Sequence, residues 1–386
     1  MRRQRWQKKA LWSTGLLLLV AVALSGCGQG GARHESWPNL IIHEGVVYAA
    51  NLETIVALEA ETGYLLWSYP PEDTDDMGPF YTEPVLVESS ELYPNGLLIV
   101  AGFKDQRVYG LALNAESSRP PQAEPAWTFA GAGGQYVGNG TLVDATYIIG
   151  NGDGKVYALS VEDGTAQWSL ETDDRVWARP VAIGDTVYIA SLDHKLYAVD
   201  LHSGELEWER ELEGAIAATP VVVNEALWVG DFTQQLYKIN PTNGEILWQE
   251  DFGAWLWATP LVDDTRLYLT NVSGEVYAFD TESETMIWDQ PVLIGEGEAI
   301  SARPALSAKG NLLFVAAYER GEIYAIDTEG NSMMRWGAIL SNPGRLPGDL
   351  TTDDERLYTM PILIEDRIRA FDLEDGSLLW NYPPTE

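Results

Sequence analysis

Few residues in this chain have the types and spacings that catalysis or metal binding requires. The only cysteine is Cys27, and the four histidines are His34, His43, His194 and His202. No two of these histidines have the i, i+4 spacing that places a metal-binding pair on one face of a helix. A chain with one cysteine also forms no internal disulfide and no zinc site ligated by several cysteines. We therefore expect no metal site.

Neighbouring acidic residues are frequent, but their spacing does not suit acid–base catalysis. They occur at Asp73, Asp75 and Asp76, at Asp173 and Asp174, at Asp263 and Asp264, and at Asp353 and Asp354. All lie in turn-like sequence, whereas glycosidase-type catalysis needs carboxylates on opposite sides of a cleft. The first group resembles part of a calcium loop, but the twelfth position of that loop is Pro84 and not an acid. We interpret these acids as solvated loop residues and predict no catalytic residues.

The net charge excludes one large class of partner. The 386 residues include 58 Asp and Glu against 24 Lys and Arg, which gives a net charge of -34 and a pI of about 4.3. Binding to nucleic acid depends on clustered basic residues, so a nucleic-acid partner is excluded. Because 46% of the residues are hydrophobic and 11% are aromatic, most of the chain must still fold around a core.

The N-terminal segment has the pattern of a lipoprotein signal peptide. Basic residues within 2–9 precede an apolar run over 16–24, which is shorter than the ~20 residues of a membrane span. The run Leu24-Ser25-Gly26-Cys27 resembles a bacterial lipobox, which implies cleavage before Cys27 and a diacylglycerol on its sulfur. The alternative is a buried free cysteine. We predict a signal peptide over 1–26, a lipidated linker over 27–36 and a folded domain over 37–386.

A repeat with a period near 40 residues fills that domain. In one copy, Tyr197 lies seven residues before Gly204, and Trp208 lies four residues after it. The same marks recur, at the same offsets in most copies, before eight tryptophans: Trp67, Trp127, Trp168, Trp208, Trp248, Trp288, Trp336 and Trp380. In the copy that ends at Trp288, Glu284 takes the place of the glycine. Recurrence of this kind indicates a repeat architecture.

Each repeat has the pattern of four short strands. Segments such as 186–190 and 196–199 alternate in polarity and are rich in β-branched and aromatic residues, and Asp, Asn, Ser and Gly separate them. A proline precedes several first strands, which suits a strand start because proline lacks the N–H of a ladder bond. A four-stranded unit of this length is typical of a propeller blade. We predict an all-β, eight-bladed β-propeller, in which 40–43 is either the first inner strand or a clasp.

The repeat resembles the pyrroloquinoline-quinone (PQQ) repeat in the run Tyr197-Ala198-Val199-Asp200 with Gly204 and Trp208, and the resemblance covers nearly all of 37–380. In that family the final-strand tryptophan docks between neighbouring blades, which implies this structural role for all eight tryptophans. The family's quinoprotein dehydrogenases carry a vicinal disulfide, a calcium site and a catalytic aspartate. With one cysteine, this chain lacks that disulfide. We expect no bound cofactor and no catalytic residues.

The order of signal peptide, lipobox, linker and propeller resembles the non-catalytic BamB-like lipoproteins of the outer-membrane β-barrel assembly machinery. This resemblance implies a monomeric, extracytoplasmic scaffold that binds envelope protein partners and is anchored to the membrane through Cys27. In a cell with two membranes, Gly28 after the cysteine favours the outer membrane, and in a cell with one membrane the protein would face outward from the cell membrane. Two alternatives stay open: a quinone- or small-ligand-binding protein, including a PQQ-dependent redox enzyme without the disulfide, and a module that binds cell-wall glycans.

One set of aromatic and basic residues has a register that suits a binding site. Each member lies three residues before a strand-starting proline or directly before one, and extension of this register adds the residue at 37. Because inner strands line the axis of a propeller, we expect the set to form an aromatic funnel at one mouth of the channel. The set consists of Trp37, Tyr81, Trp177, Arg179, Trp257 and Arg303. The alternative is that these side chains pack between blades and pair with loop acids.

Overall fold

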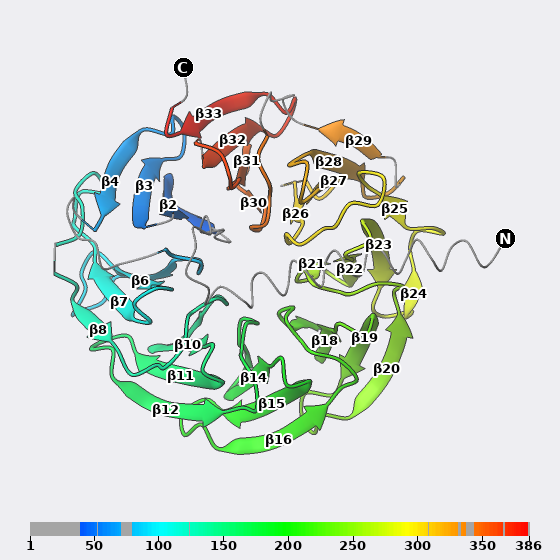
Figure 1. Cartoon of the computed structure of the whole chain (residues 1–386), viewed down its shortest axis with the longest axis horizontal. Helices are drawn as coiled ribbons and strands as arrows, with labels where there is room; N and C mark the ends of the chain where they lie inside the picture. Colours follow the sequence, from blue (N-terminus) through cyan, green and yellow to red (C-terminus); the bar gives the residue numbers. More distant parts are fainter. Residues whose placement is uncertain are drawn as a thin grey trace, which may run out of the picture. The chain divides into compact units, whose positions relative to one another are not determined.

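The computed structural model describes residues 39–384, apart from 52, 71–78, 123, 308, 331–332, 337–342 and 366. Cys27, Trp37 and the acids at 73–76 lie outside the described residues. Within the described part, the regular secondary structure consists of β-strands, which form a ring of small sheets (Figure 1). No helix in that part is long and apolar enough to cross a membrane.

Eight antiparallel sheets make up the ring, and each is built from strands that are consecutive in the sequence. The first four sheets consist of β1 (Leu40–His43), β2 (Val46–Asn51), β3 (Thr54–Glu59) and β4 (Leu65–Tyr69); β5 (Val85–Val87), β6 (Leu97–Ala101), β7 (Val108–Ala112) and β8 (Trp127–Phe129); β9 (Thr141–Val143), β10 (Thr146–Gly150), β11 (Lys155–Ser160) and β12 (Ala166–Glu171); and β13 (Val181–Ile183), β14 (Thr186–Ala190), β15 (Lys195–Asp200) and β16 (Leu206–Glu211). The others are β17 (Val221–Val223), β18 (Ala226–Gly230), β19 (Gln235–Ile239) and β20 (Ile246–Asp251); β21 (Leu261–Asp263), β22 (Arg266–Thr270), β23 (Glu275–Asp280), β24 (Thr285–Met286) and β25 (Val292–Leu293); β26 (Ala305–Leu306), β27 (Leu312–Ala316), β28 (Ile323–Asp327) and β29 (Met333–Trp336); and β30 (Thr351–Thr352), β31 (Arg356–Thr359), β32 (Ile368–Asp372) and β33 (Leu378–Tyr382). The predicted eight-bladed β-propeller is confirmed.

The order of strands within a blade follows the predicted repeat. The first strand of each sheet lies toward the centre of the ring and the fourth lies at the rim, as β30 and β33 show in Figure 1. Pro180, Pro220 and Pro260 each directly precede a first strand, where the missing N–H interrupts no ladder. In one blade Val187 pairs with Val199, and Ala198 pairs with Trp208. The tryptophan of each repeat therefore belongs to the outer part of its blade.

One blade departs from this pattern at its rim. β24 and β25 both pair with β23, and Trp288 lies between them and not within a strand. Pro291 lies just ahead of β25, where a residue without an N–H cannot continue the ladder of the preceding strand. The outer strand that the repeat predicts around Trp288 is therefore split in two.

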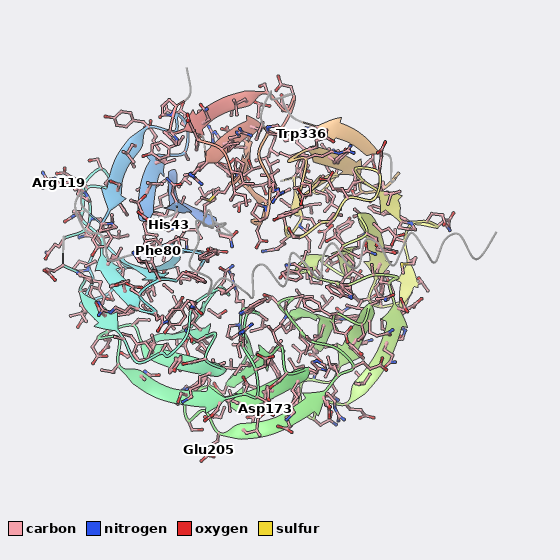
Figure 2. All side chains as sticks on the ribbon, viewed as in Figure 1. His43, Phe80, Arg119, Asp173, Glu205 and Trp336 are labelled. Atoms are coloured by element: carbon pink, nitrogen blue, oxygen red, sulfur yellow. The ribbon has the colours of Figure 1, made fainter. Side chains whose placement is uncertain are left out.

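The hydrophobic core lies between neighbouring blades. One cluster joins Tyr188 and Ala198 of one sheet to Leu227 and Val229 of the next, and all four are buried. Figure 2 shows side chains filling the spaces between sheets, while Arg119 and Glu205 lie at the outer edge of the ring. Burial of apolar surface between every pair of neighbours makes the closed ring the stable unit.

The repeat tryptophans tie each blade to the next one. The indole Nε1 of Trp168 donates a 2.7 Å hydrogen bond to the carbonyl oxygen of Leu201, and Trp127 makes the equivalent 2.9 Å bond to Val161. Similar bonds link Trp67 to Ser117, Trp208 to Pro241, Trp288 to Thr328 and Trp380 to Ala60. Six of the eight indoles are buried, and those of Trp208 and Trp248 are partly buried. These contacts place the tryptophans between blades, as the family resemblance implied.

At four joints the turn glycine of one blade is the surface on which the indole of its neighbour lies: Gly63, Gly164, Gly204 and Gly244. A Cβ at Gly204 would come within 2.7 Å of the Trp168 ring, and the φ of Gly204 is +69°. Only a residue without a Cβ fits both conditions at no cost. Glu284, which replaces this glycine in one copy, has a φ of +55° and forms a 2.6 Å ion pair with Lys238.

The ring closes between two complete blades. β1 is the first strand of the sheet β1–β4, and β33 ends the sheet β30–β33, so neither terminal strand completes the other's sheet. Trp380 on β33 donates a 3.0 Å hydrogen bond to Ala60, which follows β3. Of the two alternatives for 40–43, the first inner strand is the one that the structure adopts.

Candidate functional site

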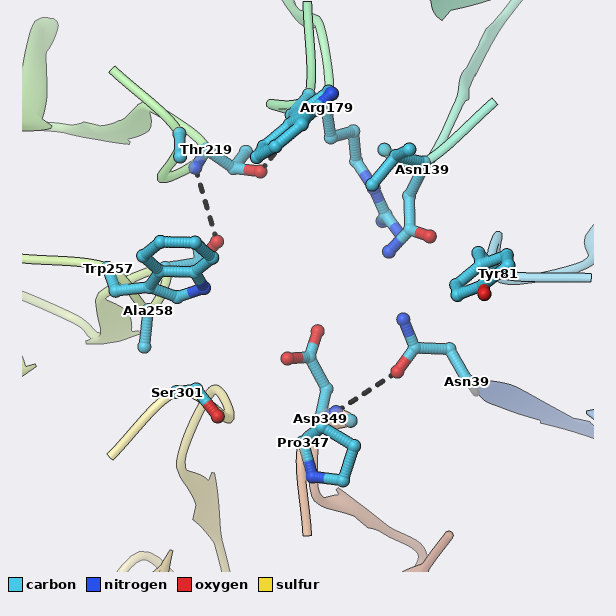
Figure 3. Close-up of a pocket in the computed structure, with 16 residues that line it drawn as sticks. Asn39, Tyr81, Asn139, Arg179, Thr219, Trp257, Ala258, Ser301, Pro347 and Asp349 are labelled. Carbon is cyan, nitrogen blue, oxygen red and sulfur yellow. Dashed lines mark hydrogen bonds between the residues drawn. The ribbon is translucent and has the colours of Figure 1, made fainter. Parts of the chain in front are cut away.

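A pocket of about 120 Å³ opens at the centre of the ring, and every blade contributes to its wall (Figure 3). The lining residues belong to the segments that lead into the first strands, because these segments converge on the axis. In one of these segments the side chains alternate: Trp177 and Arg179 line the pocket, while Ala178 between them is buried and does not line it. We call this cavity the mouth pocket.

The residue one or two positions ahead of each first strand belongs to a polar belt around the pocket. The belt consists of Asn39, Glu83, Asn139, Arg179, Thr219, Thr259, Arg303 and Asp349. Backbone N–H groups donate to the side chain of the next member, at 2.7 Å from Glu83 to Asn139, 3.2 Å from Arg179 to Thr219 and 3.3 Å from Thr219 to Thr259. Arg303 donates to Asp349 at 2.9 Å, and Asp349 donates to Asn39 at 3.0 Å. The belt thus links blades at the axis, as the indoles do farther out.

The two arginines change the belt in a predictable way. A guanidinium has donors but no acceptor, so neither Arg179 nor Arg303 can accept the N–H of the preceding member. Arg179 instead reaches past Asn139 and forms a 2.6 Å ion pair with Glu83. Burial raises the pKa of Glu83, while the nearby Arg179 opposes that rise. The ion pair therefore joins two blades that are not neighbours.

Aromatic side chains form one wall of the mouth pocket. Phe232, in the turn between β18 and β19, stacks on Trp257 with a centroid separation of 5.2 Å and an interplanar angle of 11°. Phe232 also stacks on Trp255, with a centroid separation of 5.2 Å and an interplanar angle of 16°. We call these three rings the aromatic stack. Stacking on Phe232 fixes the orientation of the Trp257 indole, which lines the pocket.

The structure brings together most of the predicted funnel. Tyr81, Trp177, Arg179 and Trp257 all line the mouth pocket. Arg303 belongs to the belt, but it is not a lining residue and it is exposed. Trp37 lies outside the described residues. The alternative that these residues pair with acids holds for Arg179, whose partner is Glu83.

Sequence reasoning missed several residues of the site. Asn139 and Asp349 belong to the belt, but Gly140 and Leu350 stand where other repeats have the proline that set the register. Glu83 does precede Pro84, so the same rule that selected Arg179 could have found it. Phe232 had no signal, because the stacking partner of Trp257 lies in a turn of another blade. In the described part of the chain, no group of three or more His, Cys, Asp or Glu residues could hold a metal ion.

Comparison with known proteins identifies the family of this chain. The family model described as outer membrane protein assembly factor BamB matches residues 11–250, 215–292 and 272–386. The chain belongs to the BamB family. No relative among the curated proteins matches it significantly.

Solved structures share the BamB propeller fold. BamB from Moraxella catarrhalis is 16% identical, with a TM-score of 0.64 over 84% of this chain and 93% of that chain. The computationally designed Ika8 protein is 15% identical, with a TM-score of 0.66 over the same shares. A likeness at this identity shows the fold alone and assigns no role to the pocket residues of this BamB-family chain.

Proposed function

We propose that this protein is a non-catalytic, extracytoplasmic scaffold that is lipid-anchored at Cys27 and binds an envelope protein partner at the mouth pocket. The observation that carries this proposal is the convergence of Tyr81, Trp177, Arg179 and Trp257, from three blades, on one pocket. Aromatic residues and arginine are enriched at protein interfaces, where they supply large contact areas at low entropic cost. Trp177, Arg179 and Trp257 are partly exposed in this wall, which favours partner binding over a purely structural role.

The contacts of the belt support binding without chemistry. Glu83 and Arg179 hold each other at 2.6 Å, and the hydroxyls of Thr219 and Thr259 accept backbone N–H groups. Groups fixed in this way orient a surface for a partner, because their rotamers are already set before binding. Membership of the BamB family supports the same proposal. In a source cell with an outer membrane, the finer role would be assembly of outer-membrane proteins.

Co-purification of the partner from gently solubilised membranes tests this function. Ala217 lines the mouth pocket, so Ala217→Trp should fill it and reduce the recovered partner at least about tenfold. Leu206→Trp is the matched control, because Leu206 is 48% exposed on the rim strand β16. Loss of the partner in the rim variant alone would overturn the assignment of the mouth.

A separate titration tests the redox alternative. Purified protein is mixed with PQQ and calcium, and the absorption spectrum and dye reduction are recorded. The scaffold proposal predicts no cofactor spectrum and no dye reduction at stoichiometric protein. Dye reduction that depends on added PQQ would replace the scaffold proposal with a quinoprotein activity.

A further inference from the structure

Asp349 differs from the other charged residue of the mouth pocket in its surroundings. Arg179 lines the pocket, but its charge is balanced by Glu83 at 2.6 Å. The Asp349 carboxylate accepts only the neutral N–H of Arg303, at 2.9 Å, among the hydrogen bonds of the described residues. No cation within the described part of the chain forms a salt bridge with it. Of the two charged residues that line the pocket, Asp349 is therefore the one without an ion-pair partner among the described residues.

We infer that the mouth pocket is a binding site for a primary alkylammonium group, seated between the carboxylate of Asp349 and the indole of Trp257. Figure 3 shows Asp349 and Trp257 bordering the same central space. This inference deepens the proposed function and rests on it for the source of the group, a lysine side chain of the bound partner. A free alkylamine offers the same chemistry, and the test below separates the two sources.

The aromatic stack suits a cation. A positive charge is attracted to the face of an indole by about 0.5 to 2 kcal/mol, and tryptophan is the strongest of the aromatic side chains in this respect. Phe232 stacks on Trp257 and also on Trp255, with 5.2 Å between the ring centroids in both cases, so the Trp257 ring is held in place by its stacking partner. A fixed ring costs less ordering when the ligand binds.

The geometry of the carboxylate favours ammonium over guanidinium. The Oδ1 atom of Asp349 already accepts the N–H of Arg303, which leaves Oδ2 for a ligand. A bidentate arginine fork would have to share Oδ1 with this N–H, whereas an ammonium is a point charge that Oδ2 alone can hold. A pocket of about 120 Å³ also fits the tip of one side chain and not a folded element.

The charge of the whole chain acts in the same direction. A net charge of -34 raises the concentration of cations near the surface and repels anionic ligands. Arg303 opposes this effect, because it belongs to the same belt and its charge lowers the pKa of Glu83. Removal of the Arg303 charge should therefore strengthen the binding of an ammonium group.

Titration with n-butylammonium, observed by ligand NMR, tests the site, and 1-butanol is the uncharged probe of similar size. Asp349→Asn keeps an oxygen that can accept the Arg303 N–H but removes the charge, so the dissociation constant should rise about tenfold or more. Glu245→Gln, in the turn between β19 and β20, removes a charge far from the pocket and should leave binding unchanged. Arg303→Ala should tighten binding a few-fold.

The outcomes separate the inference from the proposed function. Equal affinity for butylammonium and butanol, or equal affinity in Asp349→Asn and wild type, would overturn the ammonium site, while a partner still lost in Ala217→Trp would leave the scaffold proposal intact. Reduced partner recovery in Asp349→Asn supports a partner lysine as the source. Full recovery in Asp349→Asn, together with charge-dependent binding of butylammonium, assigns the site to a free amine.

Discussion

The indole of Trp380 donates a 3.0 Å hydrogen bond to the carbonyl oxygen of Ala60, across 320 residues of sequence. This bond joins the last blade to the first. The same contact also packs the Trp380 ring on Gly63, whose added Cβ would lie within 2.5 Å of it. Closure of the ring therefore uses the same tryptophan and glycine pair that joins the internal blades, and needs no exchange of strands between the ends.

Trp380→Phe is expected to destabilise the fold strongly. The substitution removes the shorter of the two hydrogen bonds to the buried Ala60 carbonyl, leaving the 3.4 Å bond from the Tyr358 hydroxyl, and it opens a gap at the joint. Together these changes should lower the free energy of unfolding by about 2 to 4 kcal/mol. Trp248→Phe is the comparison, since Trp248 is only partly buried and its Nε1 makes no hydrogen bond within the described residues. Urea unfolding measures both variants. Equal losses would contradict the role given to the Trp380 bond.

Gly204→Ala and Gly184→Ala separate steric conflict from backbone strain. Both glycines have a positive φ, at +69° and +57°, so both variants carry a strain of about 1 to 2 kcal/mol. At Gly184 nothing lies within 4 Å of an added Cβ, whereas at Gly204 the Trp168 ring lies 2.7 Å away. Gly204→Ala should therefore cost about 2 kcal/mol more than Gly184→Ala in thermal or urea unfolding. Equal costs would show that the indole moves aside freely.

The parts of the fold and of the candidate site that could be predicted are those that a local sequence pattern defines. Trp208 and Gly204 keep a fixed offset, so the blade and its turn followed from the pattern, while the role of the tryptophan at the joint was implied by the family resemblance. The polar belt was only half visible, because Asn139 and Asp349 lack the proline that set the register in other repeats. The bond from Arg303 to Asp349 depends on how eight segments meet at the axis, which no single repeat encodes.

Glu83→Gln is expected to alter the pH dependence of stability. Burial raises the pKa of Glu83 above its ordinary value of 4.5, so the folded chain holds this proton more tightly than the unfolded chain does. The contribution of Glu83 is then largest below pH 4.5 and falls as the pH rises through the raised pKa. The free energy of unfolding of the wild type, minus that of the variant, should decrease from about pH 4 to pH 7. An increase would mean that Arg179 outweighs burial.

The lipid anchor makes a prediction of its own. Cells grown with an alkyne fatty acid should label the wild-type protein and not Cys27→Ser, because the proposed anchor is a diacylglycerol on the single cysteine of the chain. The mature chain should begin at residue 27 when its N-terminal peptide is analysed by mass spectrometry. Equal labelling of both proteins, or a mature chain that keeps residues 1–26, would contradict the proposed processing.

Site-specific photo-crosslinking in intact cells tests the central claim, that this propeller works by contact at the mouth pocket, most directly. A photoreactive residue is placed at Ala217 in the pocket wall or at Leu206 on the rim. The proposal predicts one discrete crosslinked partner protein at Ala217 and none at Leu206. An excess of this protein without the photoreactive residue should reduce the crosslink at Ala217. A crosslink at Leu206 with none at Ala217 would contradict it.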